Sequence, residues 1–207
     1  MPGYGRRVEA DVCLLDARRA RRRARPPRGH RPHHGRTGGP GAGRDGDGAG
    51  HARRHPRQLS GDFERSGARF GVSWAVIAGI YAEECDFGRS RLAGCNPPGT
   101  ENPAGAQGPG QFLPTTWRRG LAPHQLIPPG PPTPTVAEGY ATDGDGDGIA
   151  DPWDPADAIA STARLLAANG AASGDVAGAI FSYNHDPSYV AAVLAHAAAY
   201  ENQASRD

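Results

Sequence analysis

Charge and apolar content divide this chain of 207 residues into two unequal parts. Residues 1–58 carry 15 arginines against 5 acidic residues, a balance of +10, whereas residues 59–207 carry 8 arginines against 17 acidic residues, a balance of −9. The first part has almost no apolar residues after Leu15. Such a segment cannot bury enough apolar surface to offset the entropy lost on ordering. We therefore predict a disordered Arg/Gly/Pro-rich tail over 1–58 and one folded domain over 59–207.

The arginine-rich tail could instead be a basic arm for a nucleic acid or for an anionic polymer of the cell wall. No aromatic residues are interleaved with its arginines to stack on bases. We therefore expect no nucleic-acid partner.

Two cysteines of the second part, Cys85 and Cys95, are ten residues apart and flank a glycine-containing loop. They could close a disulfide, which would favour an oxidising compartment, or they could be two unpaired small buried residues. We predict the disulfide and an extracellular location. No signal peptide is visible and no run is long enough to span a membrane, so a misassigned start codon would reconcile the tail with export.

The pattern of the second part favours helices and long Gly/Pro loops, so we predict an all-α fold. Apolar spacing and capping residues predict helices after Ser60 and Ser73, around Thr115, and after Asp154, Asp175 and Asp186. Residues 92–111 and 122–139 have the composition of loops. No alternating strand pattern of any length is present.

Two adjacent acidic residues, Glu83 and Glu84, end the expected apolar helix that begins at Trp74. Glu84 follows Ile80 by four residues and Ile77 by seven, so it continues the apolar stripe, whereas Glu83 is expected to be exposed. A buried carboxyl group at a helix C-terminus has a raised pKa and can act as a general acid. The alternative is a solvated or ion-paired couple at a helix end.

The repeat DGDGDGIADPWD, residues 143–154, is close to the calcium loop of an EF-hand. Calcium prefers six to eight oxygen ligands, and alternate carboxylates in a tight glycine turn supply them. The alternative is an acidic loop without a metal, but its carboxylates would then repel one another. We predict a structural Ca²⁺ held by Asp143, Asp145, Asp147, the backbone oxygen of Ile149, Asp151 and Asp154. No organic cofactor is expected.

Four segments together resemble the transglycosylase SLT family, the lysozyme-like lytic murein transglycosylases, in an actinobacterial variety. They are ECDFGRS at 84–90, GCNPPGTEN at 94–102, GPGQFLPTTW at 108–117 and FSYNHDPSYV at 181–190. The resemblance covers roughly residues 60–200 and implies a lysozyme-like helical domain.

The resemblance implies roles for four residues. Glu84 matches the catalytic glutamate, Gln111 matches a glutamine that lines the sugar cleft, and Tyr183 and Asn184 match a tyrosine–asparagine motif near that glutamate. Gly110 departs from the pattern, because the family usually has methionine there. The absence of the methionine side chain predicts a gap or extra backbone freedom beside Gln111.

The activity implied by the resemblance is cleavage of the β-1,4 bond between N-acetylmuramic acid and N-acetylglucosamine in peptidoglycan. Glu84 would act first as an acid and then as a base, and the product would be a 1,6-anhydro sugar. The alternatives are a hydrolytic muramidase and a non-catalytic domain that binds peptidoglycan glycan strands. We expect a monomer.

Overall fold

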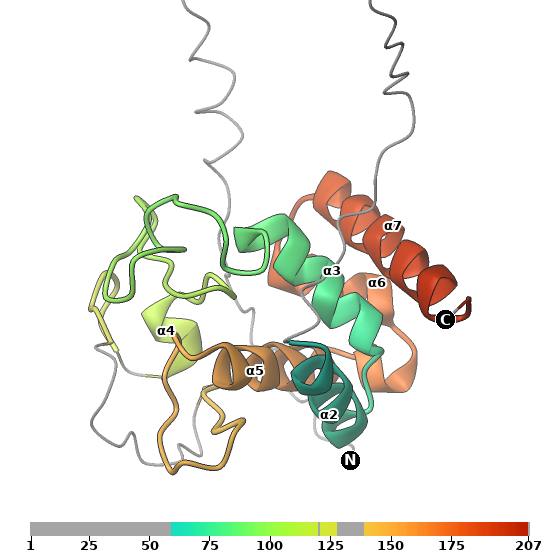
Figure 1. Cartoon of the computed structure of the whole chain (residues 1–207). Helices are drawn as coiled ribbons and strands as arrows, with labels where there is room; N and C mark the ends of the chain where they lie inside the picture. Colours follow the sequence, from blue (N-terminus) through green and yellow to red (C-terminus); the bar gives the residue numbers. More distant parts are fainter. Residues whose placement is uncertain (1–58, 120, 128–138, 207) are drawn as a thin grey trace, which may run out of the picture.

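The computed structural model describes residues 59–119, 121–127 and 139–206 (Figure 1). The predicted tail over 1–58 and most of the second predicted loop lie outside the described residues. The described residues form six α-helices and one 3-10 helix, in this order: α2 (Ser60–Phe70), α3 (Trp74–Cys85), α4 (Pro114–Trp117), α5 (Pro155–Ala168), η2 (Ala171–Ser173), α6 (Val176–Tyr183) and α7 (Pro187–Ala204).

The all-α prediction is confirmed for the part of the chain that the structure describes. It contains no β-strand, and its only β-type pairing is an isolated bridge between Gln107 and Phe112. The helix start predicted at Ser60 is wrong by one position, because Leu59 occupies the cap and Ser60 is the first helical residue. No helix in the described part of the chain is both long and apolar enough to cross a bilayer.

Aspartates start the last three α-helices, as the sequence predicted. The side chain of Asp154 accepts hydrogen bonds from the backbone nitrogens of Ala156 and Asp157, and Asp175 and Asp186 make similar bonds at the starts of α6 and α7. These bonds satisfy backbone N–H groups that have no partner within the helix. Proline follows at the first position of α5 and of α7, where its missing N–H is not needed.

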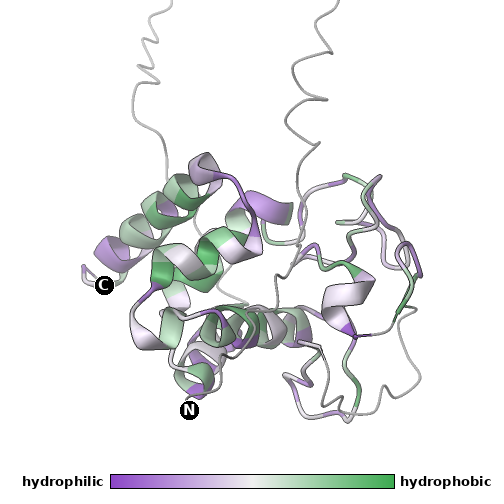
Figure 2. Cartoon of the chain, turned by 180° about the vertical axis from the view of Figure 1, so that it is seen from behind, coloured by the Kyte–Doolittle hydropathy of each residue, from purple (hydrophilic) through white to green (hydrophobic). Residues whose placement is uncertain are grey.

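Helix α3 lies inside the domain and is buried on nearly all sides. Ten of its twelve residues are buried, from Ala75 to Cys85. Figure 2 shows that α3 is hydrophobic along most of its length and hydrophilic at its last turn, where Glu83 and Glu84 lie. A helix that is apolar on all sides belongs in a core. The helices packed around α3 therefore fix the position of Glu83 and Glu84 at its end.

Helices α3 and α7 lie side by side (Figure 1). Their backbones come close at Gly79, where a Cβ atom would lie 2.7 Å from the carbonyl oxygen of Val193. Glycine at this position therefore allows the approach that brings α7 against the last turn of α3.

Replacing Gly79 by alanine should destabilise the domain, because the added methyl group would push α3 away from α7. We expect a loss of about 1–3 kcal/mol in the free energy of unfolding, measured by urea denaturation. Gly61→Ala is the matched control, since a Cβ there would meet only the end of the Arg65 side chain. Equal stability of Gly79→Ala and wild type would show that the close approach is not required.

Candidate active site

Glu84 lies in the last turn of α3, and only 8% of its surface is exposed. Tyr189, in the first turn of α7, donates its hydroxyl hydrogen to Oε1 of Glu84 at 2.6 Å. The second oxygen, Oε2, is buried and has no hydrogen-bond partner among the described residues. When the carboxyl group is protonated, Oε2 is therefore the oxygen left to carry the hydrogen.

The surroundings of Glu84 favour its neutral form. Burial raises the pKa of this carboxyl group from 4.5 to about 8. The hydrogen bond from Tyr189 lowers the pKa, and the negative charge of Glu83 raises it, but burial is the largest of the three effects. A carboxyl group of this kind can hold a proton at neutral pH and donate it to a substrate.

The prediction that Glu83 would be exposed is wrong. Its side chain is 18% exposed, and its Oε1 lies 3.0 Å from Nε2 of His196 in α7. The two neighbouring acids therefore contact the same helix through different partners. Only Glu84 combines full burial of its carboxyl group with an oxygen that no described residue bonds.

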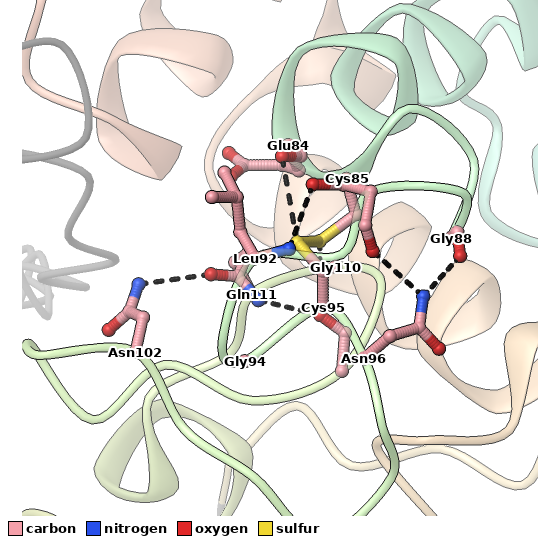
Figure 3. The surroundings of a disulfide bond; sticks show 12 residues. Glu84, Cys85, Gly88, Leu92, Gly94, Cys95, Asn96, Asn102, Gly110 and Gln111 are labelled. Carbon is pink, nitrogen blue, oxygen red and sulfur yellow. Dashed lines mark hydrogen bonds between the residues drawn. A yellow bond between two sulfur atoms is a disulfide. The ribbon is translucent and has the colours of Figure 1, made fainter. Parts of the chain in front are cut away.

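Gln111 lies in a tight turn and is 3% exposed. Its φ of 50° is in the left-handed region, which is uncommon for a residue with a side chain. The turn is held by Gly108, whose carbonyl oxygen accepts from both the backbone nitrogen and Nε2 of Gln111, each at 2.9 Å. Asn102 Nδ2 donates to the side-chain oxygen of Gln111 at 3.0 Å, as Figure 3 shows.

Tyr183 is fully buried at the end of α6, and its hydroxyl group contacts the turn that contains Gln111. Its hydroxyl group donates to the carbonyl oxygen of Gly110 and lies 3.5 Å from the hydroxyl of Thr162. Asn184, which follows it, is 6% exposed. The structure therefore connects Tyr183 to Gln111 through the backbone of Gly110.

The gap predicted beside Gln111 from the glycine at position 110 is absent, so that prediction is wrong. A Cβ atom at Gly110 would lie 2.9 Å from the ring of Phe112 and 3.3 Å from the hydroxyl oxygen of Tyr81. The space that a larger residue would need is filled by these aromatic side chains.

The predicted disulfide between Cys85 and Cys95 is present, with Cα atoms 5.5 Å apart. It joins the last residue of α3 to the loop that leads to Gln111 (Figure 3). Asn96 strengthens the same loop, because its side-chain nitrogen donates to the carbonyl oxygens of Ser90, at 2.9 Å, and Gly88. The end of α3 is thus tied covalently to its surroundings.

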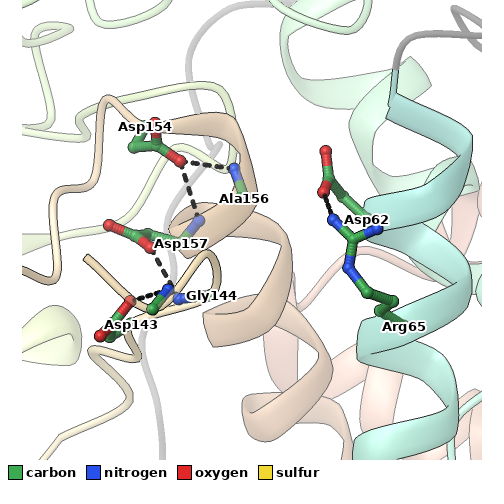
Figure 4. Close-up of polar contacts among 8 residues, drawn as sticks. Asp62, Arg65, Asp143, Gly144, Asp154, Ala156 and Asp157 are labelled. Atoms are coloured by element: carbon green, nitrogen blue, oxygen red, sulfur yellow. Dashed lines mark hydrogen bonds and ion pairs between the residues drawn. The ribbon is translucent and has the colours of Figure 1, made fainter. Parts of the chain in front are cut away.

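The acidic residues predicted as metal ligands occupy one loop before α5, but they do not all face the same point. Asp143, Asp145 and Asp157 each offer an oxygen atom within 4.8 Å of the others. Asp154 instead caps α5 (Figure 4), and Asp151 accepts from the backbone nitrogen of Trp153 at 2.8 Å. The carboxylate of Asp147 accepts from the backbone nitrogen of Ile149 at 2.7 Å.

Asp157 was not predicted as a member of this loop cluster, since it lies beyond the twelve-residue pattern. It is 1% exposed, and its two carboxylate oxygens accept from the backbone nitrogens of Gly144, at 2.7 Å, and Asp151, at 2.8 Å. Burial, the largest effect, raises its pKa to about 6. Three carboxylates this close together are hard oxygen donors that suit calcium, so the cluster fits the predicted ion.

Replacement of Glu84 by glutamine should stabilise the protein at alkaline pH. The pKa of Glu84 is raised on folding, so the folded state keeps a proton that the unfolded state releases between about pH 4.5 and 8. Wild-type stability should fall through this window relative to Glu84→Gln, with a final difference on the order of 3–5 kcal/mol. Urea denaturation at pH 5 and pH 8.5 measures it. A difference that does not change with pH would contradict the raised pKa.

A family model described as the transglycosylase SLT domain matches residues 133–179, which include the acidic loop, α5 and the first half of α6. Glu84, Gln111, Tyr183 and Asn184 lie outside the matched residues. No curated protein and no solved structure matches the chain. The helical fold is consistent with such a domain, and the match to this part of the chain supports the resemblance to the transglycosylase SLT family.

Proposed function

We propose that this chain is a lytic transglycosylase, which cleaves the β-1,4 bond between N-acetylmuramic acid and N-acetylglucosamine in peptidoglycan and leaves a 1,6-anhydro end. The matched family indicates a peptidoglycan glycosidase. The observation that carries the finer proposal is the Glu84 carboxyl group, which is buried, has a pKa raised to about 8, and has one oxygen with no partner among the described residues.

The reaction needs a proton for the oxygen that leaves the glycosidic bond. Glu84 supplies this proton from Oε2 while Tyr189 holds Oε1 in place. The carboxylate then removes the proton from the O6 hydroxyl of the muramic sugar as O6 forms a bond to C1. The proton count of the enzyme is restored, and no water is consumed.

Most glycosidases use a second carboxylate to stabilise the positive charge at C1. Asp86 is the nearest acid after Glu84 in sequence, but its carboxylate pairs with Arg89 at 2.9 Å. We propose that the N-acetyl oxygen of the substrate takes this role, as in other enzymes that act with substrate assistance. One glutamate is then sufficient.

The turn over residues 108–111, called the glutamine turn below, would orient the substrate. We propose that Gln111 and Asn184 contact the sugars and that Tyr183 keeps the turn in place through Gly110, a contact the hydroxyl group makes in the folded chain. The protein would act as a monomer, outside the cell or at the cell wall, where its substrate lies. The buried disulfide is compatible with such an oxidising compartment.

Glu84→Gln should lower the rate of peptidoglycan cleavage by about a hundredfold or more, because glutamine cannot donate or accept the required proton. Glu64→Gln makes the same chemical change on the exposed face of α2 and should leave the rate unchanged. Undiminished solubilisation of purified cell walls by Glu84→Gln would mean that the chain has a different catalyst or only binds the wall.

The same digests distinguish a transglycosylase from a muramidase. Mass spectrometry should find muropeptides with 1,6-anhydro ends, which are one water molecule lighter than hydrolysis products. Products with only free reducing ends would favour the muramidase.

We also propose that the acidic loop binds a structural Ca²⁺, with Asp143, Asp145 and Asp157 at its centre. Repulsion among the carboxylates supports this proposal. The pKa of Asp62 in α2 is raised, mainly by burial. The negative charges of Asp154 and Asp145 raise it further. A cation would offset this accumulation of charge and join the loop to α5.

Calcium should raise the thermal midpoint of the protein by an amount that grows with its concentration, and chelation by EDTA should reverse the effect. Asp143→Asn should abolish the response, whereas Glu201→Gln, an exposed change in α7, should preserve it. Identical melting curves in calcium and EDTA, with no calcium found by elemental analysis, would rule the ion out.

A further inference from the structure

The contact between Glu83 and His196 has no part in the mechanism described above. Glu83 Oε1 lies 3.0 Å from His196 Nε2, and the two side chains are 18% and 19% exposed. A carboxylate can only accept, so His196 donates through Nε2 when Glu83 is ionised. Pairs on an open surface contribute little, but this pair is mostly sheltered from solvent.

The contact between Glu83 and His196 lies on the same face of α7 as the contact between Tyr189 and Glu84. Tyr189, Val193 and His196 are spaced by four and three residues, so they lie on the same face of α7. Along that face Val193 meets Gly79, Tyr189 bonds Glu84, and His196 bonds Glu83. One face of α7 therefore holds both acids at the end of α3.

The orientation of His196 is itself constrained. Its ring stacks on the ring of Tyr200, one turn further along α7, with centroids 6.0 Å apart and planes 18° from parallel. The Cβ atom of His196 lies beside Gly79, 3.4 Å from the position that a Cβ atom would take at that glycine. A ring held on these sides is a fixed donor for Glu83.

Three buried phenol groups of the described residues interact with Glu84. The charge of Glu84 acts on Tyr189 of α7, Tyr183 of α6 and Tyr81 of α3, and raises the pKa of each phenol. These are phenols whose own pKa values are raised, mainly by burial, so they stay neutral at physiological pH. Glu83 is the carboxylate identified as acting on Glu84, and it raises the pKa of that group.

We propose that Glu83 is a positioning residue for the general acid: held by His196 of α7, its negative charge helps to keep the neighbouring Glu84 carboxyl group protonated at neutral pH. His196 acts through Glu83 by fixing where that charge lies. The catalytic consequence rests on the proposed function, but the effect on Glu84 does not.

The test measures the titration of Glu84 directly, by carbon NMR of glutamate-labelled protein, with Glu84→Gln used to assign the signal. Glu83→Gln keeps the size of the side chain and removes its charge, so the titration midpoint of Glu84 should fall by roughly half to one pH unit. Glu83→Asp keeps the charge and should retain most of the wild-type midpoint. Glu64→Gln is the matched control and should change nothing.

Unchanged titration in Glu83→Gln, or equal shifts in Glu83→Gln and Glu83→Asp, would overturn the proposal, because charge would then not be the cause. If Glu83→Gln does not fold, Glu83→Ala provides the second uncharged variant. These measurements need no substrate. An inactive wild-type protein would therefore contradict the proposed function and still leave this inference open to test.

In the active protein, Glu83→Gln should move the alkaline limb of the pH dependence of kcat/KM to lower pH by the same amount as the titration. His196→Phe keeps a ring to stack on Tyr200 but removes the donor, and should lower kcat roughly fivefold with KM unchanged. His196→Gln, which restores a donor, should recover most of this loss. A phenylalanine variant as active as wild type, or a glutamine variant no better than phenylalanine, would refute the role of His196.

Discussion

Contact between α3 and α7 determines where the Glu84 carboxyl group lies and how strongly it holds its proton. Gly79 lets the two backbones approach, and the approach places Tyr189 within 2.6 Å of Glu84. The same contact excludes water from the carboxyl group, and this exclusion is the largest cause of its raised pKa. Packing, protonation and the proposed chemistry thus have a common origin.

A buried carboxyl group at a helix end has an energetic consequence. Ionising Glu84 inside the protein is unfavourable, and the C-terminal end of α3 adds further negative potential. The fold withstands this because the disulfide ties Cys85, the next residue, to Cys95, and because α3 is otherwise surrounded by apolar residues. Groups used in catalysis commonly reduce stability in this way, and the surrounding structure offsets the loss.

Local features of the fold were predictable, and long-range contacts were not. Asp154 was recognised as a cap because a cap acts on backbone groups two or three residues away. The burial of Glu84 followed from the spacing of apolar residues along one helix, whereas its catalytic role is implied by the resemblance to the SLT family. Tyr189, however, lies 105 residues from Glu84, and nothing in the local pattern pairs the two. Asp157 was missed for a related reason, since it enters the acidic cluster from the first turn of α5, after the repeat has ended.

The acidic loop and the glutamine turn meet at Gly108, although sequence patterns treat them as separate features. A Cβ atom at this residue would overlap the carbonyl oxygen of Pro152, so only glycine fits between the two segments. The carbonyl oxygen of the same residue accepts both hydrogen bonds that fix Gln111. Displacement of the segment around Pro152 would therefore be passed directly to Gln111. Because Asp157 fastens this loop at Gly144 and Asp151, its buried carboxylate supports the glutamine turn as well as the loop.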